Sequence, residues 1–320
     1  MCSFFVRIIY MVTPAMLLLL SAGCQSDKGA LPDTFDLQGH RGAMGLKPEN
    51  TLPSFYKAVD QGVNTIEFDL AVSREHKLVI SHEPWFRSNI CLQPDGSPIP
   101  KELERTLRIY EFSYDEISEF DCGSLRHPNH PRQRTLFASK PLMTEAIIAV
   151  DEYVAASFQK PVRYNIEIKS SPTWDGILTP PPEVFARLVY EELMELEEVM
   201  NQNIMGRVTV QSFDPRPLHE FRELAPNVPI AILTSSEGSV DEHIEYFGLL
   251  PEIYSPNYGI LTQEHVQNAH KLGMRVIPWT VNRVNEMKAM VELGVDGLIT
   301  DYPDRFNEAF PERGAAIAPN

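Results

Sequence analysis

The sequence predicts an α/β fold whose parallel sheet closes into a (β/α)8 TIM barrel. Short apolar runs of strand-like composition alternate with amphipathic helical patterns, as expected for parallel strands joined by crossover helices. Gly62, Gly273 and Gly294 directly follow three of the helical patterns, where glycine commonly ends a helix. The length of 320 residues also lies within the range of one barrel domain.

Nine short segments have the composition of buried strands. They are Phe35–Gly39, Thr65–Leu70, Leu78–Ser81, Tyr164–Ile168, Arg207–Gln211, Ile230–Leu233, Ile253–Ser255, Met274–Trp279 and Gly297–Thr300. An eight-stranded barrel leaves one of them outside. Because Leu78 follows Leu70 with no room for a helix, we expect the barrel to be irregular near its second and third strands.

Helical patterns occupy most of the gaps between these strands. They are Leu52–Gln61, Thr144–Phe158, Glu183–Met200, Pro215–Leu224, Thr262–Leu272 and Asn285–Leu293. A long excursion, at about residues 84–140, separates the third strand from the second helix, whereas loops in α/β units usually have about 2–6 residues. We expect it to be an inserted cap over the active face. The barrel then spans residues 35–308, with a C-terminal tail at 309–320.

The first 23 residues have the features of a cleaved targeting signal. One charge, Arg7, precedes an apolar run from Ile8 to Leu20, which is too short for a typical transmembrane helix. Because Cys24 follows Ala22-Gly23, the segment resembles a bacterial lipoprotein signal, with Cys24 lipid-modified and residues 24–34 as a tether. This predicts a protein anchored in the bacterial cell envelope, in the periplasm or at the outer membrane. The alternative is an ordinary signal peptide with an incidental cysteine.

Cysteine usage and net charge narrow the possible classes of function. In an oxidising periplasm, Cys91 and Cys122 form either a disulfide or two buried thiols. No cysteine and histidine spacing typical of a structural zinc site is present. The net charge of −16 argues against nucleic acid and anionic membrane surfaces as ligands. An anionic substrate would therefore need a metal ion or a few well-placed Arg and Lys side chains.

Charged residues gather where the first two predicted strands end. His40 and Arg41 follow the first strand, and Glu67 and Asp69 lie two positions apart on the second, so their side chains share one face. Two buried carboxylates repel each other and shift each other's pKa unless a cation lies between them. A hard divalent cation with oxygen ligands meets this requirement.

Two further clusters end later strands. His82 and Glu83 follow the third strand, while Asn165, Glu167 and Lys169 share one face of the fourth. Each cluster alone has an ordinary structural explanation, such as a surface ion pair of little energetic value. Taken together, two histidines and three carboxylates at the ends of successive strands indicate an active site, because barrel active sites form there.

In its motifs the sequence resembles the glycerophosphodiester phosphodiesterase family, within the phospholipase-C-like phosphodiesterase barrels. The matching motifs are His40-Arg41-Gly42, Pro48-Glu49-Asn50-Thr51, Glu67-x-Asp69, His82, Pro141-Leu142-x-x-Glu145, Glu167-Ile168-Lys169, Gln211-Ser212-Phe213, Trp279-Thr280-Val281-Asn282 and Asp296-Gly297-Leu298-Ile299-Thr300-Asp301. Glu83 departs from the Asp that is usual in the family, and the 84–140 excursion is longer than in short members. Both departures concern substrate identity more than reaction type.

The resemblance implies a role for each candidate residue. By this resemblance the general acid and base are His40 and His82, and the ligands of one Ca²⁺ or Mg²⁺ ion are Glu67, Asp69 and Glu167. The phosphate contacts are Arg41 and Lys169, and Glu49 orients Arg41. The pocket is lined by Gln211 and Trp279. A neighbouring glycerol hydroxyl would attack phosphorus, and water would open the resulting cyclic phosphate. The expected products are glycerol 3-phosphate and a free alcohol.

Two other functions remain compatible with the sequence. One is a phosphodiesterase on the same barrel that acts on a lysophospholipid or phosphoinositol head group, and the other is a non-enzymatic surface lipoprotein that binds ligands. The excursion could select the leaving alcohol or only pack on the barrel, through Trp85, Phe86, Arg87, Tyr110, Phe112 and Tyr114. The expected partner is a small phosphodiester, with no nucleic acid and with membrane contact only through the anchor. The sequence does not determine the oligomeric state.

Overall fold

The computed structural model describes residues 31–312 except residue 33. The predicted signal peptide, the lipidation site Cys24 and the end of the C-terminal tail lie outside the described residues. Within the described part, no helix is both long and apolar enough to cross a membrane.

Eight parallel strands form the barrel that the sequence predicts. The strands are β1 (Asp36–Gly39), β2 (Thr65–Val72), β4 (Arg163–Ile168), β5 (Val208–Ser212), β6 (Ile230–Thr234), β7 (Ile253–Pro256), β8 (Arg275–Val276) and β9 (Gly297–Thr300). They pair in the order β8-β7-β6-β5-β4-β2-β1-β9. Backbone hydrogen bonds from Asp296 N to Val276 O and from Ile299 N to Pro278 O, both 2.9 Å, join the two ends of this order.

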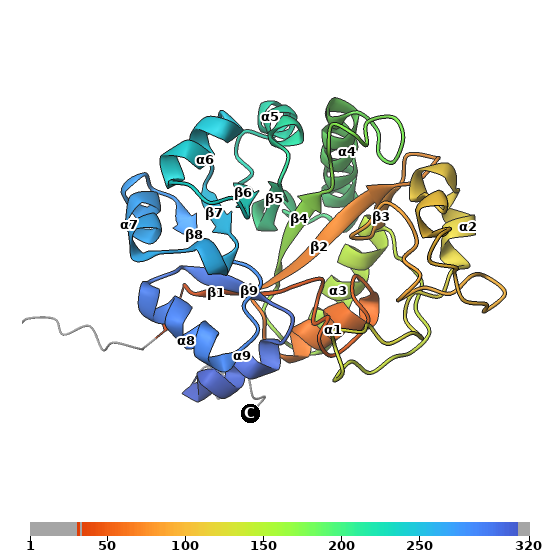
Figure 1. Ribbon diagram of the computed structural model, residues 1–320, viewed down its shortest axis with the longest axis horizontal. Coiled ribbons are helices and arrows are strands. Elements are labelled where there is room, and N and C mark those ends of the chain that lie inside the picture. Colours follow the sequence, from red (N-terminus) through yellow and green to blue (C-terminus); the bar gives the residue numbers. More distant parts are fainter. Residues whose placement is uncertain (1–30, 33, 313–320) are drawn as a thin grey trace, which may run out of the picture. The chain divides into compact units, whose positions relative to one another are not determined.

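Helices surround the strands on the outside (Figure 1). They are α1 (Leu52–Asp60), α3 (Met143–Ala156), α4 (Pro182–Met200), α5 (Pro215–Leu224), α6 (Val240–Phe247), α7 (Gln263–Lys271), α8 (Val284–Leu293) and α9 (Pro303–Ala309), with the short α2 (Tyr114–Ser118) in the excursion. α6 is not among the helices expected from the sequence, although Ser239 and Glu242 form a capping box at its start. α9 was not expected either, and its Phe306 stacks on Phe35, the residue before β1.

The predicted strand that does not belong to the barrel is β3 (Leu78–Ile80). It pairs antiparallel with the end of β2, with Leu70 opposite Ile80 and Val72 opposite Leu78. A hairpin needs only a short turn, whereas a parallel crossover needs a dozen or more residues, so the short spacing produces a hairpin. The expectation that His82 ends a barrel strand is therefore wrong, because it follows this hairpin.

The excursion after His82 has a hydrophobic cluster of its own. Phe86 stacks on Phe120 with ring centroids 3.7 Å apart, and Phe112 meets both rings edge-on. The sulfurs of Cys91 and Cys122 form a disulfide beside these rings. The cluster packs on the β2–β3 hairpin through the buried Ala71 and Val79 and extends from the barrel around α2 (Figure 1).

The main core fills the space between the strands and the surrounding helices. Phe55 of α1 and Phe68 of β2, each 1% exposed, lie with ring centroids 5.9 Å apart. At the other end of the chain, Phe310 is 6% exposed and lies 4.7 Å from the ring of Phe306. Packing on the barrel therefore continues past residue 308, where the sequence analysis began the tail.

Candidate active site

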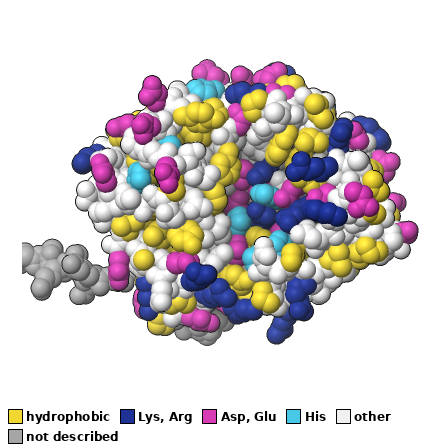
Figure 2. Space-filling model, viewed as in Figure 1, with side chains coloured by type: hydrophobic (Ala, Val, Ile, Leu, Met, Phe, Trp, Pro, Cys, Tyr) yellow, Lys and Arg dark blue, Asp and Glu magenta, His cyan; other side chains and the backbone are white. Residues whose placement is uncertain are grey.

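Seven of the predicted site residues line one cavity of about 300 Å³, whereas Glu49, Asp69 and Lys169 are not among its lining residues. The residues that line it are His40, Arg41, Glu67, His82, Glu167, Gln211, Phe213, Leu233, Trp279, Thr280 and Ile299. Figure 2 shows His, Asp or Glu, and Lys or Arg side chains gathered in the hollow at the centre of the view. Most of these residues come from the ends of barrel strands or from the segments that follow them, where barrel enzymes place their active sites.

Three carboxylates from two neighbouring strands form a compact cluster. Glu67 and Asp69 project from the same face of β2, and the strand register places Asp69 opposite Glu167 of β4. One oxygen from each of the three lies within 4.8 Å of the others. All three are buried, with Glu67 and Asp69 each 1% exposed and Glu167 6% exposed.

The protonation of this cluster reflects burial and mutual repulsion. Burial and the charge of Asp69 raise the pKa of Glu67 to about 7. Burial also raises the pKa of Glu167, to about 8, against the attraction of Lys169. Asp69 keeps its charge, since His82, Arg41 and Lys169 overcome its burial and lower its pKa.

The donor set of the cluster fits a hard divalent cation. It offers three carboxylate oxygens and no sulfur or imidazole ligand, which suits Ca²⁺ or Mg²⁺. Burial and the neighbouring carboxylate charges raise the pKa values of Glu67 and Glu167. A cation between the carboxylates would offset both effects, because it stabilises their charged forms. We therefore identify Glu67, Asp69 and Glu167 as the group that could hold the metal.

Neighbouring donors orient the carboxylates. The amide Nε2 of Gln211 donates to Glu67 Oε1 at 3.0 Å, and Asn50 Nδ2 donates to Asp69 Oδ2 at 2.8 Å. The backbone N–H of Arg41 donates to Glu67 Oε2 at 2.8 Å. Gln211 was predicted to line the pocket, and the structure adds this contact with a candidate ligand. Sequence reasoning gave Asn50 no such role beyond its place in a motif.

His40 is held by a carboxylate from the last strand. Its Nδ1 lies 2.6 Å from Asp301 Oδ1, while Asn282 Nδ2 donates to Asp301 Oδ2 at 2.7 Å. Burial and Arg41 lower the pKa of His40, but Asp301 and Glu67 outweigh them and raise it above its ordinary value. This environment shifts the protonation of His40 toward the imidazolium form. Sequence reasoning gave Asp301 no role, although its position directly after β9 was a signal.

His82 lies in the opposite electrostatic environment. Its Nδ1 is 2.9 Å from Glu83 Oε1. Burial, Arg41 and Lys169 together lower the pKa of His82 despite this carboxylate, so its neutral form is favoured. Although burial opposes the charge of Glu83, the hydrogen bond from His82 lowers the pKa of Glu83 to about 2. The residue that departs from the family pattern thus orients the second histidine.

The two predicted phosphate contacts lie beside the carboxylates. Arg41 Nη1 donates to Glu49 Oε1 at 2.9 Å, as the prediction that Glu49 orients Arg41 requires. Burial works against the charge of Arg41, but Glu49 and Asp69 outweigh it and raise its pKa. Its buried Nε–H, 3.4 Å from Asp69 Oδ2, has no hydrogen-bond partner among the residues described. Lys169 Nζ lies 2.8 Å from Glu167 Oε1.

An apolar wall faces these charges. Trp279 donates from its indole Nε1 to Ser255 O at 2.9 Å, which fixes the ring plane. Phe213 meets the Trp279 ring edge-on, with centroids 5.4 Å apart, and Leu233 and Ile299 complete the wall. Trp279 therefore lines the cavity as predicted.

Of the two roles that the sequence left open for the aromatic residues of the excursion, the structure shows packing. Phe86 and Phe112 were candidates to contact the leaving alcohol, but they pack inside the second hydrophobic cluster. The ring of Trp85 meets that of Trp174 edge-on, with ring centroids 6.3 Å apart. No residue between 84 and 140 belongs to the lining of the 300 Å³ cavity. In this structure these aromatics are structural rather than lining residues.

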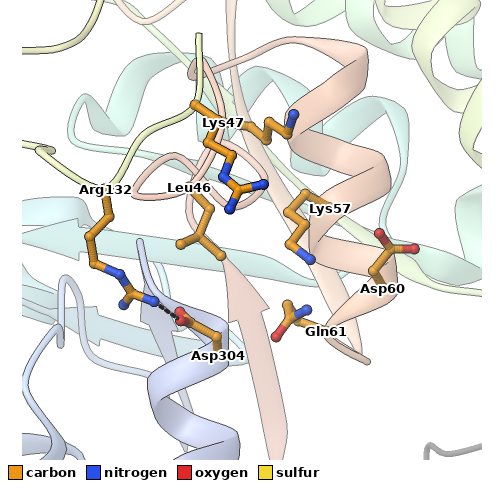
Figure 3. Close-up of a pocket in the computed structure, with 8 residues that line it drawn as sticks. Leu46, Lys47, Lys57, Asp60, Gln61, Arg132 and Asp304 are labelled. Carbon is orange, nitrogen blue, oxygen red and sulfur yellow. Dashed lines mark hydrogen bonds and ion pairs between the residues drawn. The ribbon is translucent and has the colours of Figure 1, made fainter.

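A second, larger pocket of about 610 Å³ contains none of the predicted site residues. Figure 3 shows it between the loop after β1, α1, α9 and the excursion, with Arg132 paired to Asp304. Its lining residues are Leu46, Lys47, Lys57, Asp60, Gln61, Arg132, Arg134 and Asp304. Without paired carboxylates and histidines, it lacks the acid–base groups of the smaller cavity.

Known phosphodiesterases are similar to this chain in sequence over most of its length. The family model described as "Glycerophosphoryl diester phosphodiesterase family" matches residues 40–305. A glycerophosphodiester phosphodiesterase of Bacillus subtilis (strain 168) is 28% identical over 308 residues, covering 93% of this chain and 92% of that protein. One from Caldanaerobacter subterraneus subsp. tengcongensis is 28% identical over 271 residues, covering 83% and 93%.

Solved structures share the fold. A candidate glycerophosphoryl diester phosphodiesterase from Silicibacter pomeroyi has a TM-score of 0.76 at 26% identity, covering 90% of this chain and 96% of that one. An Oleispira antarctica phosphodiesterase, solved in complex with the product sn-glycerol-3-phosphate, has a TM-score of 0.66 at 21% identity, covering 88% and 97%. The barrel fold is confirmed. The chain carries the paired histidines and the carboxylate cluster at the mouth of this barrel, and it belongs to the glycerophosphoryl diester phosphodiesterase family of phosphoric diester hydrolases.

Proposed function

We propose that the protein hydrolyses glycerophosphodiesters to glycerol 3-phosphate and an alcohol, by histidine acid–base catalysis with one divalent cation. The observation that carries this proposal is the pair His40 and His82. Both line one cavity, yet their environments push their pKa values in opposite directions. Such a pair supplies an acid and a base at the same pH.

The cation would be held by Glu67, Asp69 and Glu167 as Ca²⁺ or Mg²⁺. When bound, it neutralises charge on the phosphate and polarises a phosphoryl oxygen. Arg41 and Lys169, next to the carboxylates, would donate to the remaining phosphate oxygens. The Nε–H of Arg41 is suited to this role because no other described residue accepts from it.

In the first step, neutral His82 would take the proton of the glycerol 2-hydroxyl as its oxygen bonds to phosphorus. The phosphorus bond to the leaving alcohol breaks, and protonated His40 gives its proton to that oxygen. Holding the hydroxyl beside phosphorus supplies a proximity advantage that water lacks. The product of this step is a cyclic phosphate.

In the second step the roles reverse. His40, now neutral, takes a proton from water as the water oxygen bonds to phosphorus. The ring bond to the 2-oxygen breaks, and His82 returns its proton to that oxygen. Both histidines end in their starting protonation states, and glycerol 3-phosphate leaves the site. The Oleispira antarctica phosphodiesterase, which shares the fold, was solved with that same compound as its product.

A substrate panel tests this proposal. We expect purified protein to hydrolyse glycerophosphoethanolamine, to lose activity with a chelator and to recover it with Ca²⁺ or Mg²⁺. An analogue whose glycerol 2-hydroxyl is replaced by hydrogen should not be hydrolysed, because it cannot form the cyclic phosphate. Hydrolysis of that analogue at the normal rate would rule out the cyclic route. Preferential hydrolysis of a lysophospholipid or phosphoinositol diester would move the proposal to the second substrate class.

We also propose that Cys24 anchors the protein in the bacterial cell envelope through acyl chains, in the periplasm or at the outer membrane. The support is the sequence around the apolar run, since a small residue and glycine directly precede Cys24. Metabolic labelling with a fatty acid should mark the wild-type protein and leave Cys24→Ser unlabelled. A wild-type protein that is unlabelled and found in the soluble fraction would contradict the anchor.

A further inference from the structure

Two histidines of the excursion lie directly behind the active site. His127 and His130 are 6% and 7% exposed, with ring centroids 4.6 Å apart. His127 Nε2 is 3.8 Å from Glu49 Oε2, and His130 Nε2 is 3.9 Å from Asp301 Oδ2. Each histidine therefore faces a carboxylate that itself holds a residue lining the cavity.

The loop that carries these histidines is fixed to the barrel at several points. Gln133, 2% exposed, accepts from the backbone N–H of His127 at 2.9 Å. Its Nε2 donates to the carbonyls of Met44 at 2.9 Å and Lys47 at 3.1 Å, in the loop after β1. Arg132 pairs with Asp304 at 2.5 Å on α9, at the edge of the second pocket (Figure 3). The loop that carries the two imidazoles is thus fixed by contacts other than those with Glu49 and Asp301.

The hydrogen-bond pattern assigns the proton of His127. Its Nδ1 accepts from the backbone N–H of Asn129 at 3.2 Å. In the neutral ring the proton therefore lies on Nε2, the atom that faces Glu49 Oε2. That carboxylate oxygen is buried and has no hydrogen-bond partner among the described residues, while the other oxygen accepts from Arg41. His127 thus places a donor 3.8 Å from an otherwise unmatched oxygen.

His130 has the same relation to the other carboxylate. Its Nδ1 lies 3.1 Å from the hydroxyl of Tyr302, which can donate to it and leave the proton on Nε2. Nε2 faces Asp301 Oδ2, and Oδ1 of the same carboxylate is 2.6 Å from His40 Nδ1. Burial lowers the pKa of His130 despite Asp301, so a neutral ring lies there and the negative charge of Asp301 remains available to His40.

We propose that His127 and His130 are positioning residues: His127 orients Arg41 through Glu49, and His130 orients His40 through Asp301. The inference rests on the proposed function and extends it to the excursion, which then supports the active site without lining it. At 3.8 and 3.9 Å the contacts are longer than hydrogen bonds. Contacts of this kind often shorten when substrate binds.

The two histidines should have different kinetic effects because they act through different residues. His130→Ala should lower kcat for glycerophosphoethanolamine about tenfold and change KM less than twofold, because it loosens the proposed acid. His127→Ala should raise KM about tenfold with little change in kcat, because it loosens a phosphate contact. These values lie at the low end of the roughly 10–100-fold loss seen when outer-shell partners of site residues are removed.

Substitutions by Gln and a control variant at another histidine distinguish a positioning role from an effect on folding. Gln places an amide N–H near the position of a histidine Nε2, so His127→Gln and His130→Gln should recover most of the lost kcat or KM. His243→Ala removes a buried histidine, 6% exposed and bonded to Tyr254, neither of which lines the cavity, and should leave kcat and KM unchanged. Melting temperatures of all variants show whether each one is folded.

The outcomes distinguish this inference from the proposed function. If His40→Ala is inactive while His127→Ala and His130→Ala have wild-type kinetics, the positioning roles are wrong and the proposed function stands. The positioning roles would also be wrong if both Ala variants lowered kcat and raised KM to the same extent and the Gln variants restored neither value. If His40→Ala and Glu67→Gln keep full activity, the proposed function itself fails.

Discussion

Replacing Asp301 with Asn tests whether a buried carboxylate keeps His40 protonated. The substitution preserves the shape of the side chain but removes its charge. Asn282 Nδ2 donates to Oδ2 at 2.7 Å, so the amide oxygen of Asn would take that position. The amide NH₂ would then face His40 Nδ1, where the wild type has an acceptor at 2.6 Å. Two donors facing each other disfavour the imidazolium form.

The size of the effect follows from the lost hydrogen bond. A hydrogen bond to a charged group contributes about 1.5–3 kcal/mol. Since about 1.4 kcal/mol corresponds to one unit of pKa, the pKa of His40 should fall by about 1–2 pH units. Asp301 raises the pKa of His40, so its removal lowers the protonated fraction at any pH near or above that pKa. If His40 is the general acid, kcat at mildly alkaline pH should fall about 10–100-fold.

The assay is the pH profile of kcat with glycerophosphoethanolamine, for the wild type and the variant. We expect the alkaline limb, where the acid loses its proton, to move toward lower pH by the amount given above. Asp60→Asn is the control, because Asp60 accepts from the hydroxyl of Tyr153 at 2.7 Å and does not line the cavity. Its profile should overlay that of the wild type.

Two results would refute the reasoning about Asp301. If the alkaline limb of Asp301→Asn stays in place while kcat falls, then Asp301 does not set the pKa of the acid. If the limb moves toward higher pH, the sign of the electrostatic argument is wrong. A movement of the acidic limb alone would instead make His40 the base and exchange the proposed roles of the two histidines.

Three further predictions concern the metal group, the second histidine and the disulfide. Glu167→Gln keeps the size of a candidate ligand but removes its charge, so the concentration of Ca²⁺ or Mg²⁺ needed for half-maximal activity should rise at least tenfold, and an unchanged value would contradict its role. His82→Ala should lower kcat about 10²–10⁴-fold with an unchanged melting temperature, and a near-normal rate would exclude it as the base. Reduction of Cys91–Cys122, which closes a loop of 31 residues, should cost about 3–4 kcal/mol of unfolding free energy in denaturant titrations, and an unchanged midpoint would show that the bridge does not stabilise the fold.

Much of the fold and the site could be predicted because the signals are local. Buried strands and amphipathic helices repeat at fixed periods, so their alternation predicted the barrel. Glu67 and Asp69 share a face because side chains alternate along any strand, and this already indicated a cation. The motifs that contain His40 and His82 indicated both histidines through the resemblance to the family.

Other features depend on contacts between residues far apart in the sequence. Asp301 meets His40 across a sequence separation of 261 residues, and no periodicity encodes that pairing. His127 and His130 lie in irregular backbone, and only the docking of their loop on the barrel places them behind Glu49 and Asp301.

What the sequence by itself determined was most of the strands and helices and the strand-end chemistry, since both follow from local backbone geometry. The short spacing between β2 and β3 already favours a hairpin, but only the tertiary structure decided which of the two remains in the barrel, because strand partners are chosen by closure of the whole sheet. It also decided the unlike environments of His40 and His82, because a pKa depends on burial and on every nearby charge. Those charges come together only when the barrel closes and the last strand brings Asp301 beside the first.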